Sequence, residues 1–227
     1  NKFNFVLLNI SGEFNYSKIN NIAANYCLGN SILLLNNDVS FKTNFWGKSL
    51  LSNSLRKGIG CVGIKLIYPD NTIQHAGVIM GYGGIAGHSH CGFSSNENGY
   101  DNRLSLNQEF SAVTAACLCI SKENWNLLGG LDEYNLKVNY NDVDICLRAK
   151  NLGLSNIYLA DVEAYHFESI TRGRPIGKAY KQWRKESKYI NNKWTKIIIN
   201  DPYYSPYLSL RERSWAISLR INELNVR

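Results

Sequence analysis

The sequence predicts an α/β fold in which a mostly parallel sheet is flanked by helices. Three features support this prediction. Segments with helical periodicity alternate with short β-rich segments along most of the chain. Two of the β-rich segments, Ser31–Leu35 and residues 61–67, are almost continuously apolar, which is typical of strands buried on both faces of a parallel sheet. Each of these segments is followed by polar, turn-forming residues, where strands commonly stop.

The first half of the chain contains five predicted elements. Residues 3–10 alternate between apolar and polar side chains and predict a strand. Residues 17–28 predict a helix with Ser17 as its N-cap and Gly29 at its end. The other three elements are a strand at Ser31–Leu35, a helix at 44–57, and a strand at 61–67 that leads into a turn at 69–71.

The second half continues this alternation after a different stretch. Residues 72–100 are rich in glycine and predict loops. Further predicted elements are a buried strand at 112–121, a helix at 142–152 with Asn141 as its N-cap, and strands at 157–159 and 163–166. The alternation thus extends almost to the carboxyl-terminal region.

Composition and charge limit the possible classes of protein. With 227 residues, of which 44% are hydrophobic and 19% charged, the chain can build one sizeable core, which excludes a disordered tail or a fibre. No apolar run is long enough to predict a transmembrane helix, and the start of the chain lacks the features of a signal peptide. Six dispersed cysteines without a C-x-x-C pair fit a reducing compartment. We therefore expect a cytoplasmic protein, and the abrupt, strand-like start suggests that another segment precedes it.

The net charge of +7 is concentrated at the carboxyl end. Residues 172–227 contain 13 Lys and Arg against 4 Asp and Glu, a net +9, whereas residues 1–171 contain 12 against 14, a net −2. Residues 177–196 interleave basic and aromatic side chains at helical spacing. Three interpretations of this basic aromatic helix stay open: a solvated face of a helix packed on the main body, peripheral contact with an anionic membrane at its inner face, and, ranked last, binding of nucleic acid.

Asp38 is the first candidate for chemistry. It follows a predicted buried strand within Asn36-Asn37-Asp38, and open α/β sheets place ligand sites beyond the carboxyl ends of their strands. Such a carboxylate can bind a hard divalent cation and leave coordination positions for phosphate oxygens. An isolated Asp in a turn more commonly caps the local backbone, so this residue alone does not establish a site.

Asp142 is the second candidate. Asp142 and Asp144 lie two positions apart, about 200° around a helix, so both cannot face one site. Asp142 could serve as a general base that deprotonates a hydroxyl, or it could stabilise the start of the helix through the macrodipole.

His166, just after an apolar strand, could ligate a metal, although a lone histidine is more commonly structural. Two other patterns are set aside. The G-x-G-x-x-A pattern at residues 81–86 precedes no helix. His88, His90 and Cys91 lack a second pair of zinc ligands at suitable spacing.

The order of these segments resembles the family 2 glycosyltransferases of the GT-A fold, in particular the rhamnosyltransferase-like branch that builds bacterial surface polysaccharides. The resemblance covers nearly the whole chain, and its motifs are specific in combination. The matching stretches are FNYSKINNIAA (14–24), ILLLNNDV (32–39), GCVGIKLIYPDNTIQHAGVIMG (60–81), AVTAACLCIS (112–121), GGLDE (129–133), NDVDICLRAKNLG (141–153), HFESITRG (166–173) and DPYYSPYLS (201–209).

The resemblance implies specific site residues. Asn36, Asn37 and Asp38 occupy the place of the D-x-D motif, where Asp38 holds Mn²⁺ or Mg²⁺ against the donor diphosphate. His166 matches a histidine that completes the metal site, and a mixed nitrogen and oxygen ligand set leans towards Mn²⁺. Asp142 matches the catalytic base, with Asn141 at the usually acidic position before it. The segment that contains Trp125, Gly129 and Gly130 would line the region of the donor sugar and the acceptor.

The resemblance also implies a function and a domain organisation. We expect an inverting, metal-dependent glycosyltransferase that moves a sugar from a nucleotide-diphosphate donor to a saccharide or lipid-linked saccharide. The Q-x-x-R-W signature of processive members is absent, so a non-processive enzyme is expected. The domain at 1–171 is expected to be GT-A-like but N-terminally truncated, which would weaken donor binding by the isolated chain, and 172–227 to be a basic helical extension packed on it. The alternative is a non-catalytic carbohydrate-binding or assembly module derived from such an enzyme.

Overall fold

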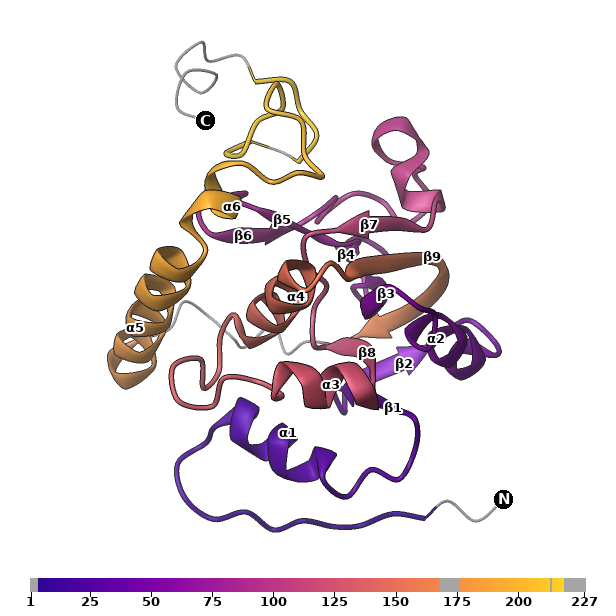
Figure 1. The fold of residues 1–227 in the computed structure, drawn as a ribbon. Helices are drawn as coiled ribbons and strands as arrows, with labels where there is room; N and C mark the ends of the chain where they lie inside the picture. The colour runs from indigo at the N-terminus through magenta and orange to yellow at the C-terminus, as the bar shows by residue number, and fades with distance from the viewer. Residues whose placement is uncertain (1–3, 168–175, 213, 219–227) are drawn as a thin grey trace.

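Figure 1 shows the fold in a computed structural model, which describes residues 4–167, 176–212 and 214–218. The helices are α1 (Tyr16–Ala24), α2 (Trp46–Ser54), the 3₁₀ helix η1 (Tyr100–Ser105), α3 (Lys122–Leu128), α4 (Asn141–Asn151), α5 (Gly177–Lys193) and α6 (Thr195–Ile199). The strands are β1 (Ser31–Leu35), β2 (Val39–Phe41), β3 (Ile59–Ile67), β4 (Ile73–His75), β5 (Val78–Met80), β6 (Ala86–His88), β7 (Gln108–Phe110), β8 (Cys117–Ser121) and β9 (Ser155–His166).

The main sheet is mixed and mostly antiparallel, which corrects the prediction of a mostly parallel sheet. Its strand order is β1-β8-β3-β9-β2, with β4 paired to β3 and β7 paired to β9. Only β3 and β9 pair in parallel, and the other pairs in this sheet are antiparallel. All nine residues of β3 are buried because the strand lies in the middle of the sheet. A continuous apolar run therefore reports burial on both faces and not the direction of the neighbouring strands.

Most predicted elements are present, but the amino-terminal strand is not. Residues 4–10 form no strand, and Phe5 and Leu7 are each 88% exposed. Residues 4–10 pair with no other strand in the described part of the chain. The alternating pattern alone was therefore not enough to form a strand. The two strands predicted at 157–159 and 163–166 are one continuous strand, β9.

The cap of α1 also differs from the prediction. Asn15 is the N-cap residue, and its side chain accepts a hydrogen bond from the backbone N–H of Lys18. Ser17 is instead fully buried, and its hydroxyl donates to the carbonyl oxygen of Leu136. Similarly, the N-cap of α4 is Tyr140, so Asn141 is the first residue of the helix.

Helices cover both faces of the main sheet, and the strands distribute their side chains between two apolar clusters. Along β8, Leu118 and Ile120 join the cluster that packs against α3 and α4, whereas Cys117 and Cys119 join the cluster that contains Leu50 of α2. This is the two-residue alternation of a strand covered on both sides. Each fully buried Leu or Ile contributes roughly 1.5–3 kcal/mol through the hydrophobic effect. Within the described ranges, no helix has the length and apolar character needed to cross a membrane.

Candidate functional site

A cavity of about 810 Å³ lies where the ends of several elements meet. Its size is within the usual range for small-molecule sites. Its polar lining comes from the turn after β1, from β4 and from the ends of β9 and α4, and Trp183 of α5 contributes an aromatic wall. Three predicted residues far apart in the sequence, Asp38, Asp142 and His166, all line it, together with Asn36, Asn37 and Asn141.

The pairing of β2 with β9 brings Asp38 and His166 together. In this antiparallel register Val39 lies opposite His166, and the backbone N–H of Phe167 donates to the carbonyl oxygen of Asp38 at 2.9 Å. The turn that follows β1 is therefore fixed against the last residues of β9. As a result, His166 Nε2 lies 3.0 Å from Asp38 Oδ1 and 3.2 Å from Asn36 Nδ2.

The hydrogen bonds of His166 indicate which ring nitrogen carries the proton. Nδ1 lies 2.7 Å from Gln74 Oε1, and a carboxamide oxygen can only accept, so Nδ1 is the donor. In the neutral ring, Nε2 then accepts from Asn36 Nδ2 at 3.2 Å, and the Asp38 carboxylate lies 3.0 Å from the same nitrogen. The partner on Nδ1 also fixes the ring orientation, as such partners do in metal-binding histidines. The His166 side chain is only 6% exposed.

The Asp38 carboxylate has a buried oxygen that is not satisfied by a hydrogen bond. Among the residues that the structure describes, Asp38 Oδ1 is a buried side-chain oxygen without a hydrogen-bond partner, although His166 Nε2 lies 3.0 Å from it. Two lone pairs at this distance repel each other unless a proton or a cation lies between them. Two neighbouring ligands of an octahedral ion, each at about 2.1 Å, are separated by about 3.0 Å. The observed separation thus fits a divalent cation.

The protein alone supplies few ligands for such a cation. No group of three or more His, Cys, Asp or Glu side chains within the described residues could hold a metal ion. Asp38 and His166 would provide one oxygen and one nitrogen, a donor set compatible with Mn²⁺. The remaining positions would be filled by water or by oxygens of a bound ligand, as is common for Mg²⁺ sites that bind phosphates.

Asp142 is held by two backbone N–H groups. Its Oδ2 accepts from Ala115 at 3.0 Å and its Oδ1 from Val143 at 2.8 Å. The carbonyl oxygen of the next residue, Ala116, accepts from the N–H of Asn36 at 3.0 Å. The two residues before β8, Ala115 and Ala116, thus contact the Asp142 carboxylate and the turn that contains Asp38, respectively. The carboxylate keeps acceptor capacity on both oxygens, so it can still bind a hydroxyl.

Tyr16 lies next to this carboxylate. Its hydroxyl donates to the carbonyl oxygen of Ala115 at 3.2 Å, and its side chain lines the cavity. Burial raises the pKa of Tyr16 above its ordinary value, and the charge of Asp142 adds to the effect. The phenol is therefore a neutral donor.

Asp144 faces away from the cavity, as the helical spacing predicts. It is fully buried and accepts hydrogen bonds from Arg148 Nε at 2.8 Å and Trp194 Nε1 at 2.9 Å. Lys193 Nζ lies 2.7 Å from its Oδ1. Asp144 thus joins α4 to the region where α5 meets α6, and of the two carboxylates only Asp142 lines the cavity.

The loop before Asp142 is held from the other side by α5. Glu186 is fully buried, and its Oε1 and Oε2 accept from the backbone N–H groups of Val138 and Asn139, each at 3.0 Å. The loop ends at Tyr140, which has a left-handed backbone (φ 60°, ψ 9°). This conformation costs a non-glycine residue roughly 1–2 kcal/mol. Such strain is retained where the surrounding contacts determine the conformation, and here it adjoins the cavity.

Three predicted binding residues are not brought to this cavity. Trp125 is 5% exposed and belongs to the core. Gly129 is the left-handed C-cap of α3 (φ 74°), and it lines a second hollow of about 460 Å³ together with Gly130 and Arg148. The proposed donor-sugar role of these residues remains a prediction. Of the HFESITRG stretch, residues 168–173 lie outside the described residues.

Some cavity residues were not singled out by the sequence analysis, or were set aside. Gln74 bonds His166, and His88, dismissed as a zinc ligand, lines the same cavity. His88 Nδ1 lies 2.7 Å from Nδ1 of the buried His75. Burial holds the pKa of His75 well below its ordinary value, and the charges of His88 and His166 act in the same direction. No local sequence signal marks Gln74 or His75 as a residue of this site.

Comparisons with known proteins concern the sequence and the fold. No family model matches the chain. It is 41% identical over 208 residues to the uncharacterized protein y4gI of Sinorhizobium fredii and 35% identical over 201 residues to the O-antigen biosynthesis protein RfbC of Myxococcus xanthus. These alignments cover 90% and 87% of this chain, but the chain spans only 23% and 15% of the length of the two relatives.

Two solved glycosyltransferase structures resemble the fold. One is GalNAc-T7 with UDP, GalNAc and Mn²⁺, with a TM-score of 0.58 and 12% identity over 77% of this chain and 34% of that protein. The chain has a GT-A-like fold. The other is the mannosyltransferase PcManGT from Pyrobaculum calidifontis in complex with GDP-Man and Mn²⁺, with a TM-score of 0.52 and 13% identity over 85% of this chain and 46% of that protein. At these identities the likeness concerns the fold alone.

Proposed function

We propose that this chain carries the catalytic base and metal ligands of an inverting, non-processive glycosyltransferase. It would transfer a sugar from a nucleotide-diphosphate donor to a saccharide or lipid-linked saccharide in the synthesis of a bacterial surface polysaccharide. The observation that carries the proposal is the buried, unsatisfied Asp38 Oδ1 beside His166 Nε2, in the same cavity as Asp142. The relative named for O-antigen biosynthesis supports the class of product.

The part of the cavity formed by Asp38 and His166 suits a donor with a diphosphate leaving group. Asp38 and His166 would hold Mn²⁺ or Mg²⁺, and a cation supplies positive charge that neutralises a departing diphosphate. The neighbouring GT-A structures contain Mn²⁺ with UDP or GDP-Man, which supports the same donor class here. Gln74 contributes by accepting from His166 Nδ1, which leaves Nε2 unprotonated as a ligand nitrogen.

Asp142 supplies the complementary chemistry. Its carboxylate would accept the proton of the acceptor hydroxyl while the hydroxyl oxygen bonds to the anomeric carbon and the bond to the diphosphate breaks. Attack opposite the leaving group inverts the configuration. Its two bonds to backbone N–H groups hold the carboxylate in one orientation, which is the positioning that a general base requires. Transfer of one or a few sugars is expected, because the chain lacks a Q-x-x-R-W signature.

Metal binding can be tested separately from activity. Mn²⁺ binding to the chain is followed by electron paramagnetic resonance, with and without UDP or GDP. We expect Asp38→Asn to weaken Mn²⁺ binding at least ten-fold. The matched control is Asp161→Asn, since Asp161 is an exposed aspartate in β9, and this variant should bind Mn²⁺ like the unmodified chain. Equal Mn²⁺ binding by both variants would contradict the assignment of Asp38.

Transfer is then measured with a panel of nucleotide sugars and saccharide or lipid-linked acceptors. Metal-dependent transfer of a labelled sugar is expected. Binding of saccharide without any transfer, unaffected by removal of divalent metal, would instead favour a non-catalytic carbohydrate-binding module.

A further inference from the structure

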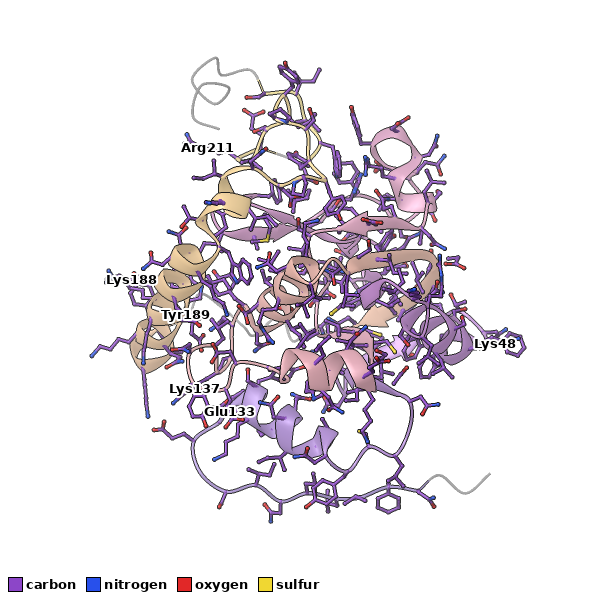
Figure 2. All side chains as sticks on the ribbon, in the orientation of Figure 1. Lys48, Glu133, Lys137, Lys188, Tyr189 and Arg211 are labelled. Carbon is purple, nitrogen blue, oxygen red and sulfur yellow. The ribbon has the colours of Figure 1, made fainter. Side chains whose placement is uncertain are left out.

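Helix α5 presents a strongly basic surface that the proposed chemistry does not use. We define its basic face as Lys178, Lys181, Arg184, Lys185 and Lys188, all of which are exposed. Four of these residues, the lysines, follow the spacing i, i+3, i+7 and i+10, which places them within an arc of about 80° on a helix. Figure 2 shows Lys188 on the outer side of α5, away from the sheet.

The opposite face of α5 is fixed to the body of the protein. Glu186 and Ile190 are fully buried, and Trp183 is half-buried in the cavity wall. The hydroxyl of Tyr189 donates to Asp132 at 3.0 Å. The orientation of the helix is therefore determined, and the basic face is held outward as a fixed surface.

The basic face carries almost no compensating negative charge. The sole acidic residue of α5, Glu186, lies on the buried side. Lys178 pairs with Glu13 at 2.6 Å, but both side chains are largely exposed, at 87% and 74%, and such pairs contribute little. A solvated helix face usually mixes both signs of charge, whereas this face has one sign over three turns. An extended anionic surface would match the positive charge of this face.

Exposed apolar and aromatic side chains accompany this charge and connect it to the cavity. Ile176, just before α5, is 84% exposed, and Tyr180 is 44% exposed. The Tyr180 ring stacks on Trp183 with a centroid distance of 5.8 Å, and the Arg184 guanidinium lies 6.0 Å from the Tyr180 ring centroid. Tyr180 lies about 80–160° around the helix from the four lysines, so it flanks the basic face.

We propose that the basic face of α5 docks this chain peripherally on an anionic lipid bilayer. Charge complementarity attracts the face to acidic headgroups. The proposal is independent of the catalytic assignment.

The test is co-sedimentation of the full chain with vesicles, without donor or metal. Vesicles of phosphatidylcholine alone are compared with vesicles that contain 30% phosphatidylglycerol, at low and at physiological salt. Each cation near an anionic surface changes the binding constant about five-fold. We therefore expect Lys185→Gln/Lys188→Gln to bind anionic vesicles about 25-fold more weakly, and the binding of the unmodified chain to fall as salt screens the charges.

The matched control removes two exposed lysines elsewhere, Lys48→Gln/Lys57→Gln. Figure 2 shows Lys48 on the side of the molecule opposite α5. This variant should bind like the unmodified chain, and circular dichroism should show that both variants are folded. Equal binding to neutral and anionic vesicles, or equal losses in the two variants, would overturn the proposal. So would retention on duplex nucleic acid that is stronger than binding to vesicles and is lost in Lys185→Gln/Lys188→Gln.

Discussion

The buried carboxylate of Glu186 gives the sharpest prediction about the loop that leads into the site. It accepts four hydrogen bonds: from the backbone N–H of Val138 and of Asn139 at 3.0 Å each, from Asn139 Nδ2 at 2.5 Å and from Gln182 Nε2 at 2.6 Å. Because every partner is a donor, no orientation of an amide at this position can satisfy all of them. Both Glu186→Gln and Glu186→Ala should therefore destabilise the protein.

The expected magnitudes follow from the number of bonds lost. In Glu186→Gln the amide nitrogen must face at least one donor, which leaves a buried N–H unsatisfied at a cost of roughly 1–3 kcal/mol. Glu186→Ala removes the acceptors of both backbone N–H groups, so roughly 2–6 kcal/mol is expected. The free energy of unfolding is measured by urea denaturation. Amide hydrogen exchange at residues 138 and 139 then reports whether the loop itself has loosened.

Glu123→Gln is the matched control, because Glu123 is an exposed glutamate in the first turn of α3. Its loss should cost no more than about 1 kcal/mol, the size of a helix-dipole interaction. The reasoning about Glu186 would be refuted if Glu186→Ala were no more destabilising than Glu123→Gln. It would also be refuted if exchange at residues 138 and 139 stayed as slow as in the unmodified chain.

Three further predictions concern the cavity and its supports. Asp142→Asn should lower kcat for sugar transfer by about 10²–10⁴-fold, the usual contribution of a general base, with little change in KM. An unchanged kcat would exclude Asp142 as the base. Burial lowers the pKa of His75, so this residue binds a proton only in the unfolded chain, and the free energy of unfolding should fall by about 1.4 kcal/mol between pH 7.5 and 5.5. His75→Phe should flatten this pH dependence, as measured by urea denaturation. An equally steep pH dependence in the variant would contradict the assignment to His75. Gly77→Ala should lower Tm by several degrees, because a Cβ there would lie 2.3 Å from the Phe110 ring at φ +93°; an unchanged Tm would show that the ring can move aside.

Local signals predicted much of the fold. The apolar run at Ser31–Leu35 and the capped pattern before Gly153 gave β1 and α4 with small errors at their ends. The direction of the strands could not be predicted in the same way. Burial of β3 on both faces has the same sequence signature whether its neighbours run parallel or antiparallel, and the pairing partners are distant in the sequence.

The sequence analysis singled out Asp38, Asp142 and His166, which line the cavity, but not the residues that support them. The helical spacing of Asp142 and Asp144 correctly separated a cavity residue from a buried one. Nothing local, however, marks Gln74 as the partner of His166 or Glu186 as the acceptor for the loop before α4, because these contacts join residues 92 and 48 positions apart. A carboxylate in a helix of lysines resembles an ordinary surface residue until the packing of that helix is known.

The anchoring of α5 has a practical consequence for protein engineering. The change from acidic to basic composition near residue 171 invites a chimera cut at that point, yet Glu186 and Trp194 bond directly to the loop before α4 and to α4 itself. A donor sequence grafted onto residues 1–171 would have to reproduce those two anchors or carry its own version of the loop. Exchanging α4, its preceding loop and α5 through Trp194 as one block would move both anchors together with their partners.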